Sequence, residues 1–365
     1  MTEAGEGVEG VSRRSLLGRM LAAVPLLWAG QGAFAKSNTT VDVRRFGARG
    51  DGRTDDTRAF QAAIDSLRNG GIVDVPTGIY RIDAERSVRL RSGVHLRLAR
   101  SAQLHAIPNA VERSYVLLVQ EVRDVRITGG RIVGERDRHR GASGEWGHGI
   151  AIYASQNVSV REIHIAKCWG DGISIGGRAK RGAPPRPSMD IEIANVTCLD
   201  NRRQGLTIGR SRRVRVFDCE FSDTGGTPPA AGIDVEPDAG DIARDVRIER
   251  CVVRRNKGPG IQVWKNSSSV TIRECTIEDN RNAGILTVGA HDIDIERNRI
   301  RGNGKAGIVL RQKSGDVSIA GNTFARNAPG RARSTPRGRD PRWARHLETA
   351  ADTGAVRIAP DNRFD

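Results

Sequence analysis

The chain has 365 residues with a net charge of +16, and 38% of its residues are hydrophobic but only 4% aromatic. This length suits two ordinary domains or one elongated one, whose core must be built from Ile, Val and Leu. The five cysteines are an odd number with no zinc-like spacing, which argues against a disulfide framework or a zinc site. The positive charge is spread along the chain, which fits solubility as well as an anionic partner, and no nucleic-acid recognition motif is present.

The first 35 residues are typical of an export signal. Ser12 to Leu17 resembles the twin-arginine export motif, and an apolar run from Leu16 to Trp28 precedes a small-residue cleavage site at Ala33–Ala35. The run is short for a membrane span, although an uncleaved anchor is the alternative. We therefore expect the twin-arginine export machinery as a partner, a periplasmic or secreted location, and no membrane contact after cleavage.

Residues 36–70 predict an opening segment that ends in a capping helix. Polar residues at 54–57 are followed by apolar residues at helical spacing, namely Ala59, Phe60, Ala63, Ile64 and Leu67. Such a helix would close the open end of a solenoid, which otherwise exposes its core.

One unit recurs from residue 149 onward, and looser copies extend upstream to about residue 71. Its first half is Gly, an aliphatic residue, any residue and usually another aliphatic. Copies begin at Gly149, Gly172, Gly205, Gly232, Gly260, Gly284 and Gly307. Period-two alternation indicates a strand with one buried face, and a fixed repeat in the twenties indicates a solenoid. We therefore predict a parallel β-helix over residues 71–327, with two or three short strands in each coil.

The second half of the unit predicts two ladders of side chains at turns. Cys219, Cys251 and Cys275 fall at the same repeat position as Asn298 and Asn322. A second column consists of Asn256, Asn280, Asn303 and Asn327. We expect small side chains stacked inward, with amides bonding turn backbone. Reactive or disulfide-bonded thiols are the alternative, although buried free cysteines are usually inert.

Residues 328–365 are dense in Arg, Pro and Gly and predict a basic, flexible C-terminal tail. Within this tail, residues 355–358 have the alternation of one last strand.

Residues Val43–Thr57 resemble the opening motif of the pectate lyase-like superfamily, which includes rhamnogalacturonases and family 28 glycoside hydrolases. Residues Val73–Tyr80 resemble the next segment of that superfamily. The resemblance implies an all-β fold, a right-handed parallel β-helix that binds carbohydrate along its side. It does not imply one activity, because the same motif begins phage tailspikes and epimerase-like proteins.

The catalytic pattern of the polygalacturonases is absent. That pattern has a paired Asp-Asp, then Gly-His-Gly, then Arg-Ile-Lys on successive coils. Here Gly170-Asp171-Gly172 has a single acid, Gly147-His148-Gly149 lies upstream of it, and Arg-Ile-Lys does not occur. Polygalacturonase chemistry is therefore not implied.

The segment from Gly232 to Asp238 is the best candidate for catalysis. If Ile233 and Val235 point inward, Asp234 and Glu236 share the outer face and titrate as a coupled pair. Their Cβ spacing of roughly 6–7 Å selects neither a retaining nor an inverting glycosidase. We assign Asp171 as a supporting acid. Ordinary solvated charges are the alternative to catalytic roles.

A calcium ion is the cofactor expected if the protein is a lyase, and otherwise none is expected. Asp234 and Glu236 would then hold Ca²⁺ with help from Asp238.

Residues near the acid pair are candidates for substrate binding. They are His148, Arg178, Arg210, Gln262, Trp264 and Lys265. The indole would stack on a sugar ring, and the cations would bind sugar carboxylates. His148 has a general acid or base role as its alternative. Three insertions, 134–147, 177–189 and 222–231, are expected to wall the groove.

These features predict an exported enzyme that cleaves a polysaccharide, one with acidic sugars, by hydrolysis or β-elimination. Two alternatives stay open: a non-catalytic envelope protein that binds glycan or lipopolysaccharide, and a tailspike-like depolymerase.

Overall fold

The computed structural model describes residues 39–180, 182–329 and 340–365. The predicted twin-arginine motif, apolar run and cleavage site lie outside the described residues. None of the helices in the described ranges is long and apolar enough to span a bilayer.

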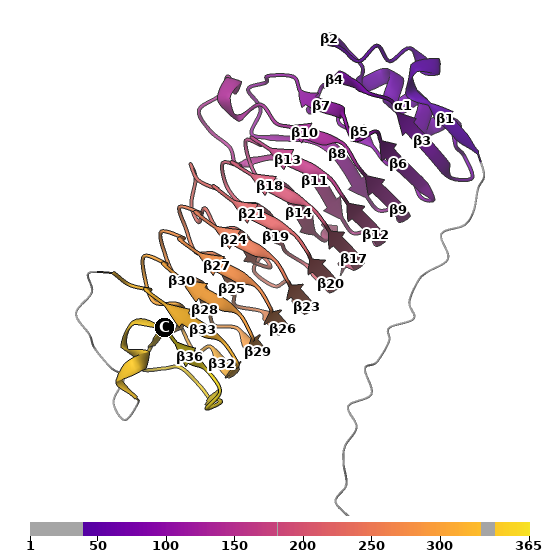
Figure 1. Cartoon of the computed structure of the whole chain (residues 1–365). Coiled ribbons are helices and arrows are strands. Elements are labelled where there is room, and N and C mark those ends of the chain that lie inside the picture. The colour runs from indigo at the N-terminus through magenta and orange to yellow at the C-terminus, as the bar shows by residue number, and fades with distance from the viewer. Residues whose placement is uncertain (1–38, 181, 330–339) are drawn as a thin grey trace, which may run out of the picture. The chain divides into compact units, whose positions relative to one another are not determined.

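Each coil of the chain contributes strands to parallel sheets that run along a solenoid (Figure 1). Sheets A and B have 12 strands each, and sheet C has 10. A separate antiparallel hairpin joins two strands of the insertion at 177–189. The predicted all-β right-handed parallel β-helix is thus confirmed, with three strands in a typical coil.

The elements have the following bounds. Sheet A contains β1 (Thr40–Asp42), β3 (Gly71–Val75), β6 (Val94–Leu98), β9 (Arg123–Thr128), β12 (Gln156–Arg161), β17 (Ser188–Ala194), β20 (Ser211–Phe217), β23 (Ala243–Glu249), β26 (Ser267–Arg273), β29 (His291–Glu296), β32 (Gly315–Ala320) and β35 (Val356–Ile358). Sheet B contains β2 (Asp51–Asp55), β4 (Gly78–Ile82), β7 (Ala102–Ala106), β10 (Arg131–Val133), β13 (His164–Ala166), β18 (Thr197–Leu199), β21 (Glu220–Ser222), β24 (Val252–Arg254), β27 (Thr276–Glu278), β30 (Arg299–Arg301), β33 (Thr323–Ala325) and β36 (Arg363–Phe364). Sheet C contains β5 (Val88–Arg89), β8 (Arg113–Gln120), β11 (Trp146–Tyr153), β14 (Ile173–Gly176), β19 (Leu206–Ile208), β22 (Ile233–Val235), β25 (Ile261–Trp264), β28 (Ile285–Val288), β31 (Ile308–Arg311) and β34 (Leu347–Thr349). The hairpin is β15 (Arg178–Lys180) with β16 (Ala183–Arg186), and the helices are η1 (Val43–Phe46), α1 (Thr57–Ser66), η2 (Arg136–Arg138) and η3 (Pro341–Arg345).

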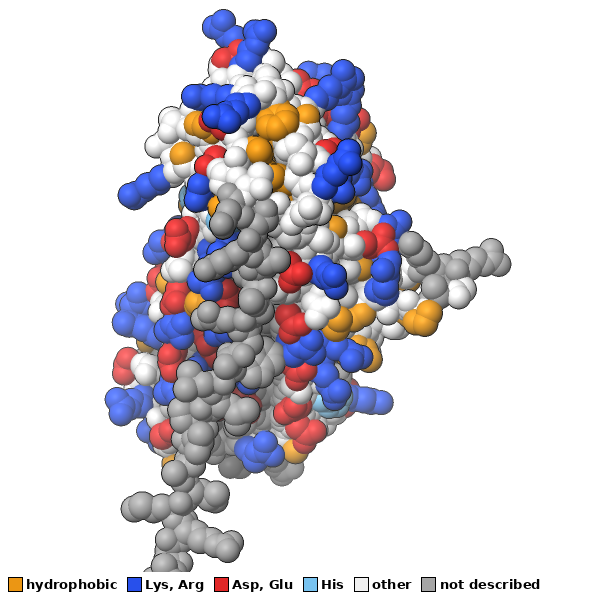
Figure 2. Space-filling model, turned by 90° about the vertical axis from the view of Figure 1, so that its right-hand side faces the viewer, with side chains coloured by type: hydrophobic (Ala, Val, Ile, Leu, Met, Phe, Trp, Pro, Cys, Tyr) orange, Lys and Arg blue, Asp and Glu red, His pale blue; other side chains and the backbone are white. Residues whose placement is uncertain are grey.

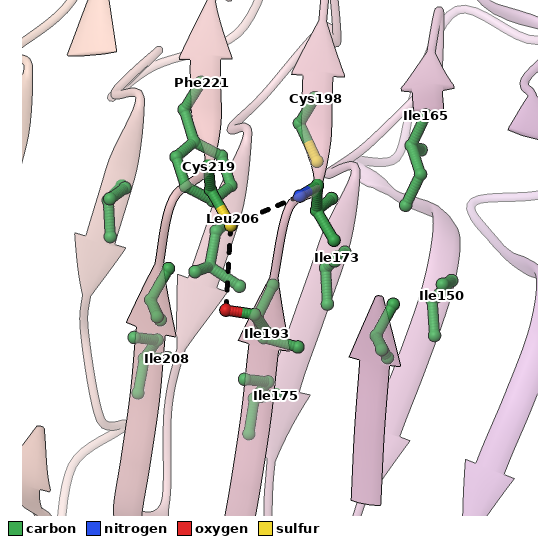
Figure 3. Close-up of a cluster of buried hydrophobic side chains, with 14 of the residues drawn as sticks. Ile150, Ile165, Ile173, Ile175, Ile193, Cys198, Leu206, Ile208, Cys219 and Phe221 are labelled. Atoms are coloured by element: carbon green, nitrogen blue, oxygen red, sulfur yellow. Dashed lines mark hydrogen bonds between the residues drawn. The ribbon is translucent and has the colours of Figure 1, made fainter. Parts of the chain in front are cut away.

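The core is made of columns of like residues, as the repeat predicts. The aliphatic residue after each repeat glycine pairs in register with its copy one coil away, so that Ile150, Ile173 and Leu206 form one column. All three are completely buried, and Figure 3 shows them stacked along successive coils. Coils repeat at the interstrand distance of about 4.8 Å, so each aliphatic residue is covered on both sides.

The repeat glycines are required by the close approach of neighbouring coils. A Cβ on Gly260 would lie 2.7 Å from the carbonyl oxygen of Gly284 and 2.7 Å from the Asn280 side-chain amide. Both atoms belong to a fixed ladder, so no side chain larger than hydrogen fits without displacing backbone.

The asparagine ladder has the predicted function of bonding turn backbone. The Asn280 Oδ1 accepts the backbone N–H of Asn256 at 3.1 Å, and its Nδ2 donates to the carbonyl of Val253 and to Asn303. Because each amide repeats this pattern one coil away, the buried turn groups are satisfied.

The cysteine ladder continues into asparagines, also as predicted. Cys251 donates its backbone N–H to the Cys275 sulfur at 3.4 Å, and Cys275 donates its own to Asn298 at 2.9 Å. Figure 3 shows the equivalent bond from Val196 to Cys219. All five thiols are free and buried. Burial raises the pKa of Cys251 well above its usual range, which suits a packing role.

The expected N-terminal helix is present as α1. Its Phe60, Ala63 and Ile64 are completely buried and belong to the same core as the sheets. The Phe60 ring meets that of Tyr80 edge-on at 5.2 Å. Strands β1 and β2 precede the predicted start of the solenoid at residue 71, so the parallel sheets begin earlier than expected.

The C-terminal end departs from the predicted flexible tail. Strands β34, β35 and β36 pair with β31, β32 and β33 and complete another coil, whose β35 was expected. Trp343 of η3 is buried against Phe324 at 5.2 Å and Phe364 at 4.8 Å. These rings cover the last coil, and their burial stabilises a segment whose composition alone suggested disorder.

Candidate functional site

The outer face of sheet C carries a cluster of polar side chains that we call the acid cluster. Three of its residues directly precede repeat glycines: His148, Asp171 and Gln204. A second column occupies the middle of successive strands, in register: Ser174, Thr207, Asp234 and Gln262. The register therefore places Thr207 and Gln262 on the strands on either side of Asp234.

Asp234 lies at the centre of the acid cluster and is completely buried. Its carboxyl group accepts a hydrogen bond from Gln204 Nε2 at 2.7 Å and one from Gln262 Nε2 at 3.1 Å. Burial, and then the charge of neighbouring Glu236, raise the pKa of Asp234 well above its usual range. Both effects favour the protonated form of Asp234.

Glu236 is the member of the pair that reaches solvent, with 31% of its side chain exposed. Arg203 bridges this carboxylate, at 3.4 Å, to Glu145 on the insertion at 134–147, at 3.5 Å. The same guanidinium lies 3.4 Å from Asp171. Burial by itself lowers the pKa of Arg203. The surrounding carboxylates, Asp171 foremost, have the larger combined effect and raise the pKa of Arg203.

Asp171 and His148 form the inner edge of the acid cluster. Asp171 is completely buried, accepts a hydrogen bond from Thr207 Oγ1 at 2.8 Å, and donates its backbone N–H to His148 Nδ1 at 3.0 Å. Burial raises the pKa of Asp171 to about 6, against the opposing effect of Arg203. Burial lowers the pKa of His148 to about 3, so the imidazole is neutral and its acceptor Nδ1 leaves the hydrogen on Nε2.

Stacked rings hold the insertion at 134–147 beside the acid cluster. The Trp169 ring lies between the imidazole of His139, at 3.8 Å, and the guanidinium of Arg202, at 3.7 Å. Arg202 also donates to the carbonyl of Gly144 at 2.9 Å. Because Glu145 follows directly, this stack fixes the carboxylate that faces Arg203.

The structure brings together only some of the predicted substrate-binding residues. His148 and Gln262 belong to the acid cluster but are buried, and Gln262 bonds Asp234 rather than facing solvent. Trp264, at the end of β25, is partly exposed, and Lys265 is exposed in the following turn.

The two predicted arginines already have acidic partners. Arg178 pairs with Glu121 at 2.8 Å, and Arg210 pairs with Asp241. Neither is therefore a free cation for a sugar carboxylate, and Arg203 is the arginine at the acid pair.

The residues proposed for calcium do not fit that ion. Asp238 is exposed in the loop after β22 and contributes no oxygen to the acid cluster. In the described ranges no three His, Cys, Asp or Glu side chains converge as a metal site. The guanidinium of Arg203 already supplies the positive charge beside Glu236, so no step is derived through calcium.

Sequence reasoning missed Arg203, Gln204 and Glu145. A signal for Gln204 existed, because the residue before the repeat glycine is polar only in His148, Asp171 and Gln204 among the seven copies. The equivalent positions in later coils are Ala231, Pro259, Ala283 and Ala306. No comparable signal existed for Glu145, which lies in an insertion outside the repeat.

A surface hollow of about 340 Å³ lies apart from the acid pair, beside the hairpin at 178–186. Its lining includes Glu121, Ser155 and Arg186. The insertion at 177–189 thus walls this hollow rather than Glu236. The insertions at 134–147 and 222–231 are joined by the hydrogen bond from Arg136 to the carbonyl of Gly225 at 2.7 Å.

Comparison with known families gives two matches. The family described as right-handed β-helix region matches residues 109–242 and 228–334. The family described as rhamnogalacturonase A/epimerase, pectate lyase-like, matches residues 40–97.

Comparison with individual proteins gives distant relatives. The SPbeta prophage-derived uncharacterized protein YorA of Bacillus subtilis is 27% identical over 280 residues, covering 68% of this chain and 47% of YorA. The mannuronan C5-epimerase AlgE2 of Azotobacter vinelandii is 25% identical over 248 residues, covering 63% of this chain and 23% of AlgE2. The solved A-module of the A. vinelandii mannuronan C-5 epimerase AlgE6 superposes with a TM-score of 0.63 at 17% identity, covering 89% of this chain and 97% of the module. The chain spans less than half the length of the first curated relatives that it matches.

Proposed function

Because this chain belongs to the right-handed β-helix family, we propose that it is a carbohydrate-active enzyme that cleaves an acidic polysaccharide on the outer face of sheet C. One observation carries the proposal: a buried carboxyl group, Asp234, and an exposed carboxylate, Glu236, share a face with the bridging Arg203. A fold that places perturbed carboxyl groups beside a fixed guanidinium is suited to proton transfer next to a bound anion.

The roles of the three acids follow from their exposure. Glu236 contacts the substrate and transfers the proton, because Asp234 and Asp171 are completely buried whereas 31% of the Glu236 side chain is exposed. Asp234 is a positioning residue, whose protonated form is favoured by burial and by the neighbouring charge of Glu236. Asp171 holds Arg203 and Thr207 in place.

Arg203 positions the two partly exposed carboxylates of the cluster. Its guanidinium lies between Glu236 and Glu145, with 14% of its side chain exposed. In β-elimination, Glu236 held in this way is the base that removes the proton next to the sugar carboxylate. In hydrolysis, the same arrangement offers Glu236 and Glu145 as the two carboxyl groups that flank the bond. Trp264 supplies a stacking surface one coil further along.

The test is turnover of a panel of acidic and neutral polysaccharides, with new reducing ends and unsaturated products both monitored. Glu236→Gln should reduce kcat by at least about 100-fold, because a general acid or base contributes that much. Asp238→Asn, which removes an exposed carboxylate outside the acid cluster, is the matched control and should keep full activity. Undiminished turnover by Glu236→Gln overturns the proposal. Reducing ends without unsaturated product identify hydrolysis, and both signals together identify β-elimination.

A second candidate is a glycan-binding protein without turnover. The observation that favours it is the complete burial of Asp234 and Asp171, which leaves Glu236 and Glu145 as the accessible carboxylates of the cluster. Binding of a polysaccharide by the parent protein, with neither product signal, would establish this candidate.

Export is part of the proposed function and rests on the sequence of residues 1–35. Replacing Arg13 and Arg14 with Lys should retain the protein in the cytoplasm if the twin-arginine machinery carries it. The measurement is the distribution of the protein between cytoplasmic and periplasmic or culture fractions.

A further inference from the structure

Sheet A carries a repeated pattern of arginines that the acid cluster does not use. The pattern Arg-x-Val-Arg occurs at 212–215 on β20 and at 244–247 on β23. The valines at 214 and 246 are completely buried, so the arginines that follow them lie on the outer face. The positive φ of Arg213 and Asp245 interrupts the alternation, so that the arginines at 212 and 244 also lie outside. Those at 212, 244 and 247 are exposed and the one at 215 is partly exposed.

Strand register places these arginines directly opposite one another. Arg212 pairs with Arg244, and Arg215 pairs with Arg247, on adjacent parallel strands. Like charges in direct register destabilise a sheet. Two rows of two arginines therefore run along the solenoid, and we call them the arginine rows.

Other arginines of the same sheet have their charge compensated within the chain. Arg97 pairs with Asp74 at 2.5 Å, and Arg273 pairs with Glu249 at 3.0 Å, each across one coil. Within the arginine rows, Arg215 lies 3.7 Å from Glu192. Over the described ranges, no carboxylate lies within ion-pair distance of the other three.

The pattern recurs in a third place. Residues 123–126 on β9 repeat Arg-x-Val-Arg, and the register through β12 and β17 puts Arg123 in the column of Arg212 and Arg126 in the column of Arg215. On the two strands in between, β12 and β17, the first column carries Gln156 and Met189 and the second carries Ser159 and Glu192, so arginines face each other directly only on β20 and β23.

We propose that the arginine rows bind a single-chain polyanion, specifically a glycan that carries carboxylate groups. Neighbouring arginines within a row are one interstrand distance apart, about 4.8 Å. The two rows are separated by Arg213 and Asp245, whose positive φ bends each strand. Carboxylates along one glycan chain that lies over the two strands meet guanidinium groups of both rows, with the planar bidentate geometry that arginine and carboxylate share.

The surface lies on sheet A, whereas the acid cluster lies on sheet C, so this inference goes beyond the proposed function. Figure 2 shows Lys and Arg side chains distributed over one face of the molecule with acidic side chains among them. Net charge alone therefore does not distinguish this surface from the rest of the molecule. The arginine rows differ because their members are aligned in register and three of the four have no carboxylate partner among the described residues.

The test compares two variants with equal charge change, both in a Glu236→Gln background so that the probe is not cleaved. The first replaces Arg212, Arg215, Arg244 and Arg247 with Gln. The control replaces four exposed arginines elsewhere, namely Arg100, Arg131, Arg281 and Arg299. The probe is a fluorescently labelled oligogalacturonate, with neutral dextran, a single-stranded oligothymidylate and vesicles of phosphatidylcholine with phosphatidylglycerol as comparisons.

We expect the first variant to lose affinity for oligogalacturonate by about tenfold or more, and the control by less than about threefold, since each exposed ion pair contributes modestly. The first variant should also unfold at a higher denaturant concentration than the control, because the repulsion between the paired arginines within each row is gone. Equal losses in both variants would attribute binding to diffuse charge and overturn the proposal. Tighter binding of the oligothymidylate or of vesicles than of oligogalacturonate would overturn the glycan assignment.

Discussion

Replacing Asp171 by Asn should stabilise the fold more and more as the pH rises. Asp171 is completely buried, and burial raises its pKa to about 6 from an ordinary value of 3.8. The folded state therefore binds this proton more tightly than the unfolded state does. The parent protein consequently loses stability as the pH rises through this window, and an uncharged Asn does not.

The magnitude follows from the two pKa values. A difference of about 2 units corresponds to about 3 kcal/mol, reached when the carboxyl group is ionised in both states. The free energy of unfolding of the variant minus that of the parent should therefore increase by about 2 kcal/mol between about pH 4.5 and pH 8. Asn keeps an oxygen that accepts from Thr207, so the local geometry is retained.

The assay is urea-induced unfolding of the parent and Asp171→Asn at a series of pH values, with reversibility checked at each. Asp238→Asn, an exposed position, is the control and should leave stability nearly unchanged throughout. A difference between Asp171→Asn and parent that stays flat, or that shrinks as the pH rises, would refute the reasoning about burial. It would mean that Arg203 and Thr207 compensate the buried charge in full.

Three further predictions concern stability and use the same unfolding assay. Asn280→Ala should cost about 2–4 kcal/mol, because it leaves the buried N–H of Asn256 without its acceptor; a cost below 1 kcal/mol would show that water replaces the amide. Gly260→Ala should cost at least about 2 kcal/mol, because its Cβ meets the carbonyl of Gly284, and an unchanged midpoint would contradict the close approach. Trp343→Ala should cost about 3–5 kcal/mol by uncovering the last coil, whereas a neutral effect would show that η3 does not cover the core.

The fold was predictable because its determinants are local and repeated. The alternation around Gly172, Gly205 and Gly232 fixes which side chains point inward, and the repeat length fixes which coils meet. The columns of Asn280 and Cys275 follow from the same count, with no knowledge of distant contacts. In a periodic sequence, the repeat itself therefore determines which residues pair on neighbouring strands.

The candidate site was only partly predictable. Alternation correctly put Asp234 on the outer face, but an outward residue was expected to be exposed, and neighbouring side chains cover it instead. Arg203 lies in a turn, outside the alternating segment, and its partner Glu145 lies in an insertion with no repeat. Contacts of this kind depend on side-chain packing between segments, which no periodicity encodes.

The C-terminal coil shows a different limit. Composition at 328–365 indicates disorder, yet the last strands of each sheet offer unpaired backbone groups and an open core edge. Leu347 and Val356 pair with those edges, and Trp343 covers them. Pairing with the strands of the preceding coil, rather than the composition of the C-terminal segment, therefore determines the structure of these last strands.

Because each coil contributes one strand to sheet C, the residues of the acid cluster change most simply by the gain or loss of a whole coil rather than of a single residue. Asp234 and Gln262 are 28 positions apart in sequence but one strand apart in space. Loss of a whole coil beyond Trp264 would shorten the solenoid and leave the cluster whole. Loss of the coil between Gly172 and Gly205 would instead remove Ser174 and Arg203 and set Ala151 against Thr207. In a scaffold of this kind, binding properties change when a whole coil is gained or lost. An insertion such as 134–147 adds a new segment to a core that stays unchanged.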